Sequence, residues 1–408
     1  MEESKKPGFA ELATQAGWQT LEKQAAVGYK SSHLYIGVPK EHSFEENRVA
    51  LTPDSVRTLV NNDHTVVIEA GAGERAHFSD REYADAGARI VYETEKVFEA
   101  DIIVKVAPLA QDDADLLHDR QTLISPIHLP TLKGDLLQTL MRKRATAIAF
   151  EFFKDENGTF PFVRSMSEIA GNSAILIASE LLSDDTHGKG MLLGGITGIP
   201  PTKVLILGAG VVGEYAARAA LGLGATVMVF DNNIYKLLRL QNNIGTRLYT
   251  STINPEVLAA ELCTADVAVG AIHSELGRTP VVVNEEMIAN MKPGSVIVDI
   301  SIDQGGCFET SELTTTTKPT FKKYDVIHYC VSNIASRVSN TASTAVSNIV
   351  TTSLFKAADS GGFENLIRHS AGARHGVYIY NGFLTNLHLS QSFGMKYTEL
   401  DLLMASSM

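Results

Sequence analysis

A glycine-rich turn in the middle of the chain limits the possible fold most strongly. The segment KVLILGAGVVGEYAARAALGLGATVMVFD contains the pattern G-x-G-x-x-G at Gly208, Gly210 and Gly213, between an apolar β-branched run and a helical stretch. In this pattern the first glycine allows a tight turn, the second lets the backbone approach a pyrophosphate, and the third lets helix and strand pack closely. The segment therefore predicts a Rossmann-type dinucleotide-binding unit, with phosphates at the helix N-terminus.

An acidic residue follows at the position that selects the nucleotide. Asp231 ends the next apolar run, about 20 residues after the glycines, where a carboxylate hydrogen-bonds the ribose hydroxyls of NAD. Its charge would repel the 2′-phosphate of NADP, and no arginine follows it directly. We therefore predict NAD as the cofactor. Lys236, one turn into the next helix, either reaches the adenine ribose or is simply solvated.

Short apolar runs alternate with helical stretches over most of the chain. Strands separated by helices indicate βαβ units and parallel sheets. The first block of predicted strands comprises YIGVP, HTVVIEAGAG, ARIVY, ADIIVKV, TLISPIHLP and TAIAFEFF. The second block comprises KVLIL, ATVMVFD, ADVAVGAI, SVIVDISID and DVIHYCVSN. We predict an α/β fold with two such domains.

The boundaries follow from the helices between and after these blocks. PFVRSMSEIAGNSAILIASELL reads as a long apolar helix that bridges domains, and TASTAVSNIVTTSLFKAA as a second long helix before a polar tail. We predict a helical extension at residues 1–33, a first domain at 34–162 plus 340–408, which is discontinuous, and a nucleotide-binding domain at 163–339. An apolar stripe in the extension (Phe9, Leu12, Trp18, Leu21) favours packing on its own domain or a neighbouring subunit over a partner-binding device.

Composition excludes several classes of protein. The 408 residues carry a net charge of −12, which argues against nucleic acid as a partner. The three cysteines form no CxxC pair, so we expect a reduced compartment with neither disulfides nor a zinc cluster. No stretch approaches the roughly 18 apolar residues that a membrane span needs. The N-terminus has no secretory h-region, and we predict a cytoplasmic protein without a membrane partner.

Three residues of the first block are candidates for chemistry. Arg48, just before a predicted helix start, either offers a bidentate fork to a carboxylate or forms a surface salt bridge. His128, at a strand end beside prolines, is a candidate general acid/base, because the unperturbed pKa of histidine lies near neutrality. Lys105 lies within an apolar strand, where a snorkelling lysine is the common explanation.

The segment VDISIDQGGCFE, residues 298–309, admits three interpretations. A metal site needs more ligands than Asp299 and Asp303 supply, because apolar residues separate them. A Cys307 nucleophile would need a partner that stabilises the thiolate, and the sequence shows none. Ligands bind outside the carboxyl ends of parallel strands, so we expect Asp303 to face the nicotinamide half of the cofactor.

These segments resemble the alanine dehydrogenase/nicotinamide nucleotide transhydrogenase family. The resemblance runs from about Ile36 to about Tyr378 and rests on IGVPKE, ENRVALTP, EAGAGE, MSEIAG, the glycine turn, KPGSVIVDI, IDQGGCFE and YCVSN. IDQGGCFE, the HL of PIHLP and MSEIAG are similar to the alanine dehydrogenase branch. The resemblance implies two Rossmann-like domains with NAD in the cleft between them, and a homo-oligomer, a hexamer or a dimer.

The resemblance also implies reversible oxidative deamination of L-alanine to pyruvate and ammonia. It would make Arg48 the holder of the substrate carboxylate, with Lys105 beside it, His128 the acid/base, and Asp303 the group that orients water or ammonia. The residues implied to line the cofactor site are Ser167, Val211, Val212, Asp231, Lys236, Ala271, Ile272, His273, Ile300, Ser301, Ile302, Asp303, Val331, Ser332, Asn333 and Ile334.

One departure from the family pattern leaves alternatives open. The family strand typically reads KVKEP, and its second lysine contacts the substrate, whereas KVAPL here places Ala107 near that lysine. Two alternatives to L-alanine deamination therefore stay open. One is an NAD-dependent dehydrogenase of another small amino or oxo acid, and the other is a non-catalytic NAD-binding relative.

Overall fold

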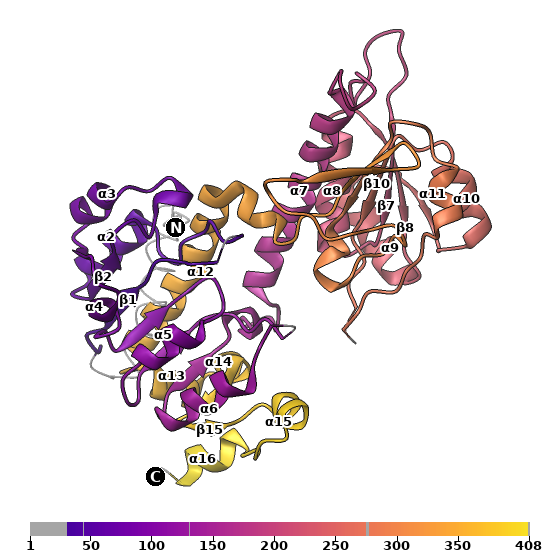
Figure 1. Ribbon diagram of the computed structural model, residues 1–408. Helices are drawn as coiled ribbons and strands as arrows, with labels where there is room; N and C mark the ends of the chain where they lie inside the picture. Colours follow the sequence, from indigo (N-terminus) through magenta and orange to yellow (C-terminus); the bar gives the residue numbers. More distant parts are fainter. Residues whose placement is uncertain (1–30, 44, 130, 275–276, 407–408) are drawn as a thin grey trace, which may run out of the picture.

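The computed structural model describes residues 31–43, 45–129, 131–274 and 277–406. Two α/β domains, each built around one mostly parallel sheet, lie side by side (Figure 1). The predicted extension at residues 1–33, except for its last three residues, lies outside the described residues.

The first domain contains an eight-stranded sheet in the order β15-β14-β6-β5-β4-β1-β2-β3. Its parallel strands are β1 (Tyr35–Val38), β2 (Thr65–Glu69), β3 (Arg89–Val91), β4 (Ile102–Val104), β5 (Thr122–Ile124) and β6 (Thr146–Ile148). The helices between them are α2 (Pro53–Asn61), η1 (Glu74–Ala76), α3 (Asp80–Asp85), α4 (Thr94–Val97), α5 (Gln111–Leu116) and α6 (Gly134–Arg142). Thr52 precedes α2 and Pro53 occupies its first turn, where the missing N–H costs nothing.

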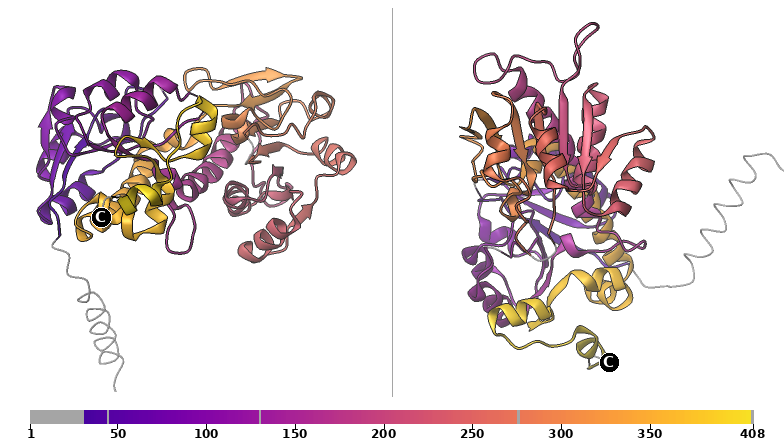
Figure 2. Two further views of the ribbon diagram at one scale, coloured as in Figure 1. Left: turned by 90° about the horizontal axis from the view of Figure 1, so that it is seen from below. Right: turned by 90° about the vertical axis from the view of Figure 1, so that its right-hand side faces the viewer.

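The end of the chain completes this sheet. β14 (Val377–Tyr380) pairs antiparallel with β6, and β15 (Phe383–Leu384) pairs with β14. The remaining C-terminal helices are α13 (Phe363–His369), α14 (Ala371–Gly376), α15 (Leu387–Phe393) and α16 (Leu400–Ser406), and this segment stays beside the first domain (Figure 2). The predicted discontinuity of the first domain is thus confirmed.

The second domain contains a seven-stranded sheet in the order β12-β13-β11-β10-β7-β8-β9. Its strands are β7 (Lys203–Leu207), β8 (Thr226–Phe230), β9 (Tyr249–Ser251), β10 (Val267–Gly270), β11 (Val296–Asp299), β12 (Thr320–Lys323) and β13 (Val326–Tyr329), and only β12 runs antiparallel. The helices are α8 (Val211–Gly222), α9 (Ile234–Ile244), α10 (Pro255–Leu262) and α11 (Glu285–Ala289). The sequence did not reveal β9 or β12, because both are short and polar.

Two long helices in mutual contact carry the chain between the domains, α7 (Pro161–Ser183) and α12 (Ser339–Asp359). α12 buries Val346, Val350 and Leu354 in the core of the first domain, beside strand residues such as Ile36. Within the described ranges, neither these nor the other helices combine the length and apolarity that a bilayer crossing requires.

In two of the predicted strand segments, the strand ends early and the chain continues as a 3₁₀ turn. TAIAFEFF leaves the sheet at Ile148 and forms a 3₁₀ turn, η2 (Phe150–Phe152), which lets Phe150 and Phe153 both enter the first core. SVIVDISID leaves the sheet at Asp299 and continues as η3 (Ile300–Gln304), because the Asp299 carboxylate accepts the N–H of Ser301 and starts the turn. Asp303 therefore lies within a 3₁₀ turn after the strand, and not at the strand end as predicted.

The contribution of α12 to the first core can be measured with Leu354→Ala. Leu354 is fully buried, so we expect a loss of about 2–5 kcal/mol in the free energy of unfolding, from lost transfer energy and the cavity left behind. Leu402→Ala is the control, because Leu402 is 65% exposed and its truncation should cost under about 0.5 kcal/mol. Urea unfolding followed by circular dichroism measures both, and equal losses would contradict the placement of α12.

Candidate active site

The three glycines of the turn have three different constraints. Gly208 has φ +110°, and a Cβ there would lie 2.4 Å from the carbonyl oxygen of Ala271. A Cβ on Gly213 would lie 1.9 Å from the carbonyl oxygen of Gly208, so this glycine permits close packing of α8 on the turn. Gly210 precedes α8 and has open space where a Cβ would be. This is the space that a pyrophosphate at the helix N-terminus requires.

Asp231 lies beside this turn, directly after β8. Its Oδ2 accepts the N–H of Ala209 at 2.7 Å, and its Oδ1 accepts the N–H of Asn233 at 2.7 Å. Lys236 lies exposed in the first turn of α9. Arg239, further along α9, donates to the carbonyl oxygen of Ala209 at 3.1 Å. The sequence analysis missed Arg239, since nothing local links it to the glycine turn.

The other predicted cofactor residues follow the carboxyl ends of neighbouring strands. Ala271 follows β10 and donates to the carbonyl of Leu207 at the end of β7, and the N–H of Ile272 donates to Ser301 Oγ in η3 at 3.0 Å. Half-buried Ile300 and buried Ile302 flank Ser301, and Val331, Ser332, Asn333 and Ile334 follow β13. Val211 and Val212 begin α8, Ser167 is half-buried on α7, and His273 is exposed. All of these except Ser167 lie in the segments that directly follow strands of the second sheet, with Val211 and Val212 in the first turn of α8.

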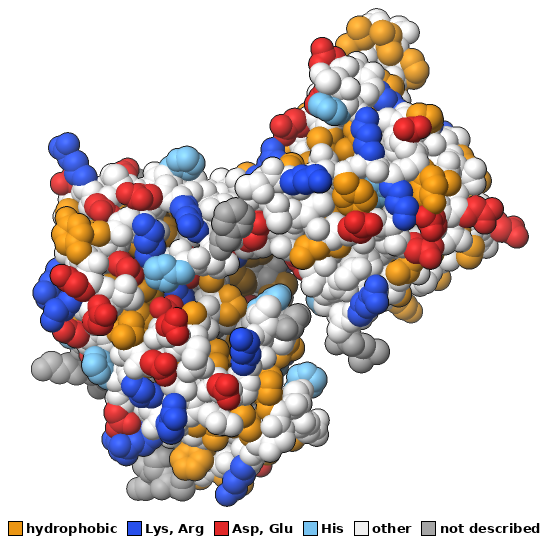
Figure 3. Space-filling view, in the orientation of Figure 1, with side chains coloured by type: hydrophobic (Ala, Val, Ile, Leu, Met, Phe, Trp, Pro, Cys, Tyr) orange, Lys and Arg blue, Asp and Glu red, His pale blue; other side chains and the backbone are white. Residues whose placement is uncertain are grey.

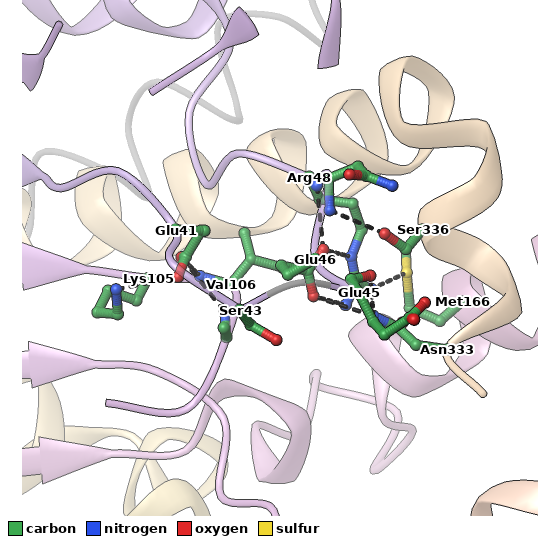
Figure 4. Close-up of polar contacts among 12 residues, drawn as sticks. Glu41, Ser43, Glu45, Glu46, Arg48, Lys105, Val106, Met166, Asn333 and Ser336 are labelled. Atoms are coloured by element: carbon green, nitrogen blue, oxygen red, sulfur yellow. Dashed lines mark hydrogen bonds and ion pairs between the residues drawn. The ribbon is translucent and has the colours of Figure 1, made fainter. Parts of the chain in front are cut away.

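Arg48 forms an ion pair with Glu46 on the side of the cleft that belongs to the first domain. Its Nε donates to Glu46 Oε1 at 2.7 Å and its Nη2 to Glu46 Oε2 at 2.6 Å (Figure 4). Its Nη1 lies 3.1 Å from the sulfur of Met166 on α7. The Arg48 side chain is only 8% exposed, so the surface salt bridge considered for it is excluded.

Asn333 connects this ion pair to Asp303 of the second domain. The Asn333 side chain donates to Glu46 Oε2 at 3.1 Å, and its backbone N–H donates to Asp303 Oδ1 at 3.1 Å. Asn333 has a left-handed backbone with φ 52°, a conformation that asparagine tolerates better than most residues. The residue therefore faces both domains at once.

Asp303 reaches solvent, yet the protein around it removes enough water to raise the pKa of its carboxyl group. The N–H of Asn333, His128 and Arg48 oppose this rise in the pKa. His128 and Arg48 of the first domain thus lie within electrostatic reach of Asp303 of the second domain. The surface of the molecule is hollowed between the two domains (Figure 3). Arg48, His128 and Asp303 come from separate segments of the chain, and the fold brings them near one another.

His128 projects from the loop after β5. Its imidazole is exposed, and Nδ1 lies 3.0 Å from the hydroxyl of Thr131 in the same loop. This contact leaves Nε2 available for a ligand in the cleft.

Serine hydroxyls hold the backbone that leads to and from Arg48. The N–H groups of Asn47, Val49 and Thr52 donate to the hydroxyls of Ser336, Ser343 and Ser347 at 2.9, 3.0 and 2.9 Å. The sequence analysis missed this role. The serine-rich composition of α12 was visible, but its partners lie almost 300 residues away.

Lys105 does not join Arg48. Its ammonium lies 2.9 Å from Glu41 Oε2 and 3.4 Å from Asp113 Oδ2, and the side chain is 2% exposed. Burial opposes the charge, but the two carboxylates outweigh burial and raise the pKa of Lys105. Lys105 was predicted to contact the substrate; the structure instead gives it two buried carboxylate partners, and snorkelling is excluded as well.

Asp299 and Cys307 of the segment VDISIDQGGCFE shape the loop that follows η3. The Asp299 carboxylate accepts the N–H of Cys307 at 2.9 Å and the hydroxyl of Ser311 at 2.7 Å, so it closes the loop after η3. Cys307 is fully buried, and burial followed by the charge of Asp299 raises the pKa of its thiol, which opposes thiolate formation. Among the described residues, no group of three His, Cys, Asp or Glu side chains is placed to hold a metal ion.

Fold and site together define a two-domain α/β protein with a Rossmann-type nucleotide fold and charged groups facing the cleft, the class to which many dehydrogenases belong. The sequence matches the family domains described as "Alanine dehydrogenase/PNT, N-terminal domain" over residues 37–170 and "Alanine dehydrogenase/PNT, C-terminal domain" over residues 174–387. The chain belongs to the alanine dehydrogenase/PNT family.

Individual relatives agree with this assignment. An alanine dehydrogenase of Halomonas elongata is 37% identical over 367 residues, which is 90% of this chain and 98% of the relative. An alanine dehydrogenase of Bacillus subtilis is 38% identical over 365 residues, 89% of this chain and 96% of the relative. A solved L-alanine dehydrogenase superposes with a TM-score of 0.82 at 37% identity, covering 88% of this chain and 99% of that one. A transhydrogenase from Sinorhizobium meliloti shares the fold, with a TM-score of 0.74 at 23% identity over 86% of this chain and 99% of that one.

Removal of the Lys105 charge distinguishes a structural role from a substrate contact. Lys105→Met leaves two carboxylates buried without a cation, so we expect a loss of about 3–5 kcal/mol in the free energy of unfolding. Lys356→Met is the matched control, since Lys356 is 56% exposed beside Glu156 and its pair should contribute under about 1 kcal/mol. Urea unfolding measures both. A Lys105→Met protein of wild-type stability but with a raised KM would contradict the structural role.

Proposed function

We propose that this chain catalyses the NAD-dependent, reversible oxidative deamination of L-alanine to pyruvate and ammonia. The observation that carries the proposal is the grouping of Arg48, His128 and Asp303 at the cleft, in a chain 37–38% identical to alanine dehydrogenases over about nine-tenths of its length. In this reaction a hydride leaves the α-carbon, water adds to the resulting imine carbon, and ammonia departs.

The cofactor would lie along the carboxyl edge of the second sheet. The pyrophosphate would occupy the space beside Gly210, and Asp231 would face the adenosine ribose, with Arg239 and Lys236 beside it. Asp231 supports NAD over NADP, because its carboxylate would repel a 2′-phosphate. NAD supplies the hydride acceptor, and the protein supplies orientation and charge.

Arg48 would hold the substrate carboxylate. Glu46 occupies the guanidinium edge formed by Nε and Nη2, so a second carboxylate would bind the edge formed by Nη1 and Nη2. There it would displace only the weak contact with the sulfur of Met166. Burial favours this contact because little water competes for the guanidinium N–H groups, whereas the charge of Glu46 opposes the approach of a second carboxylate.

His128 would move the protons. Its free Nε2 would accept a proton as water attacks the imine carbon and return it in the reverse direction. Asp303, whose carboxylate accepts the N–H of Asn333 and lies near His128 and Arg48, would orient the water or ammonia. Lys105 would stabilise the fold around Glu41 and Asp113 instead of binding substrate.

We further propose a homo-oligomer, a hexamer or a dimer, in the cytoplasm. A loop of the second domain projects from the body and carries the exposed apolar side chains Leu192, Ile196 and Ile199, 62%, 62% and 58% exposed (Figures 1 and 3). Exposed apolar groups on a projecting loop favour a protein–protein contact.

The proposed activity is tested by incubating the purified protein with NAD and a panel of L-amino acids while NADH absorbance is followed. We expect turnover with L-alanine, and NADH consumption with pyruvate and ammonium. Turnover of a different amino acid alone would favour the second candidate, which the alanine at position 107 and the paired Lys105 support. NAD binding without any turnover would indicate a non-catalytic relative.

The role of His128 is tested with His128→Ala. We expect kcat to fall by about 100-fold or more, the typical contribution of a general acid/base, while the dissociation constant of NAD stays unchanged. His118→Ala is the control, because exposed His118 precedes β5 at the opposite edge of the sheet. A His128→Ala enzyme with near-normal kcat would eliminate the acid/base role.

A further inference from the structure

A carboxylate lies behind the loop that carries His128. Glu151 belongs to η2, directly after β6, and β6 is the neighbour of β5 in the first sheet. Glu151 Oε1 accepts the backbone N–H of Ile127 at 2.5 Å. The residue immediately before His128 is therefore held by a side chain from the adjacent strand connection.

This contact joins the loop to the rest of the domain by a hydrogen bond, in addition to the partial packing of Ile127 and Leu132 against the apolar core. Ser125 still pairs with the carbonyl of Ile148. Beyond it, the described residues between Ser125 and the start of α6 form hydrogen bonds only within the loop, from Thr131 and Leu132 to His128 and Leu129. The bond from Ile127 to Glu151 is the exception. A loop with so few external hydrogen bonds moves easily once that bond is lost.

Glu151 is half-buried and has no neutralising partner among the described residues. Burial raises the pKa of Glu151 to about 7, although the N–H of Ile127 opposes the rise. Its Oε2 is buried and has no hydrogen-bond partner among the described residues, and no described Lys, Arg or His forms an ion pair with it. Burial and then the charge of Glu151 raise the pKa of Tyr378, so the Tyr378 hydroxyl lies near this carboxylate.

We propose that Glu151 is a positioning residue for His128, acting through the N–H of Ile127 to hold the loop so that the imidazole faces the cleft. The proposal rests on the proposed function, because it takes His128 as the acid/base. A carboxyl group that is shielded from water and has no cation beside it destabilises the fold when it ionises. An apolar residue would fill the same space without this cost, so packing alone does not explain a glutamate here. Its single strong bond points to the loop.

The proposal has a pH-dependent consequence. A carboxylate accepts a hydrogen bond more strongly than a neutral carboxyl group, so protonation of Glu151 weakens the anchor. Because this pKa is about 7, the loop should be held more firmly above pH 7 and less firmly below it. The titratable group that the electrostatics place beside Glu151 is Tyr378 of β14, and its effect runs from the Glu151 charge to the tyrosine.

Two variants separate positioning from plain structural support. Glu151→Ala removes the acceptor, and we expect kcat to fall by about tenfold or more with little change in KM or NAD affinity. Glu151→Gln keeps an amide oxygen that accepts from Ile127, so it should retain kcat within about threefold of wild type at pH 8 and lose the ionisation near pH 7 from the kcat profile. Glu156→Ala is the control, because its side chain is 92% exposed.

A second measurement does not depend on turnover. Amide hydrogen exchange in residues 126–132 should become faster in Glu151→Ala, remain near wild type in Glu151→Gln, and be faster at pH 6 than at pH 8 in wild type after correction for the intrinsic rate. Wild-type kcat and exchange in Glu151→Ala would overturn the proposal. The proposal would also be overturned if Glu151→Ala and Glu151→Gln lost kcat to the same extent and melting temperature to the same extent, because that result indicates structural support alone. If the wild-type protein oxidised no amino acid, the proposed function would fail while exchange still decided whether Glu151 anchors the loop.

Discussion

The ion pair between Glu46 and Arg48 is the constraint on which the rest of the site depends. A guanidinium that is only 8% exposed requires a carboxylate partner, and Glu46 supplies it through two short bonds. The same Glu46 carboxylate accepts the side chain of Asn333, whose backbone holds Asp303. The ion pair of the first domain is thereby connected to Asp303 of the second domain. The positions of these residues on the two sides of the cleft depend on one another.

The need of buried backbone N–H groups for hydrogen-bond acceptors explains why serine hydroxyls in and just before α12 lie beside this ion pair. The segment around Arg48 is extended but belongs to neither sheet, so its buried N–H groups need other acceptors. Ser336, Ser343 and Ser347 supply them. Since α12 also packs its apolar side chains into the first core, the helix that connects the two domains fixes Arg48 as well. The connection between the domains and the position of Arg48 therefore depend on the same helix.

Local patterns predicted what local geometry determines. The glycine turn and most strands were correctly predicted, because turn, strand and helix are encoded within about 30 consecutive residues. Asp231 lies directly after β8, and its bond to the ribose of NAD stays a prediction. The 3₁₀ turn that carries Asp303 was missed, since it depends on one bond between the Asp299 side chain and the N–H of Ser301. An apolar run of this kind reads equally well as a longer strand.

Long-range partners could not be predicted from one sequence. Lys105 stood out as a lysine in an apolar strand, but Glu41 and Asp113 lie on separate segments, and only the fold brings them together. Residues whose roles depend on such pairings were misassigned or missed. The most direct test of the whole account is a crystal structure of the chain with NADH and pyruvate. We expect the pyruvate carboxylate on Nη1 and Nη2 of Arg48, with Glu46 still bound to Nε and Nη2. A carboxylate bound to Lys105, with Arg48 unengaged, would contradict the account.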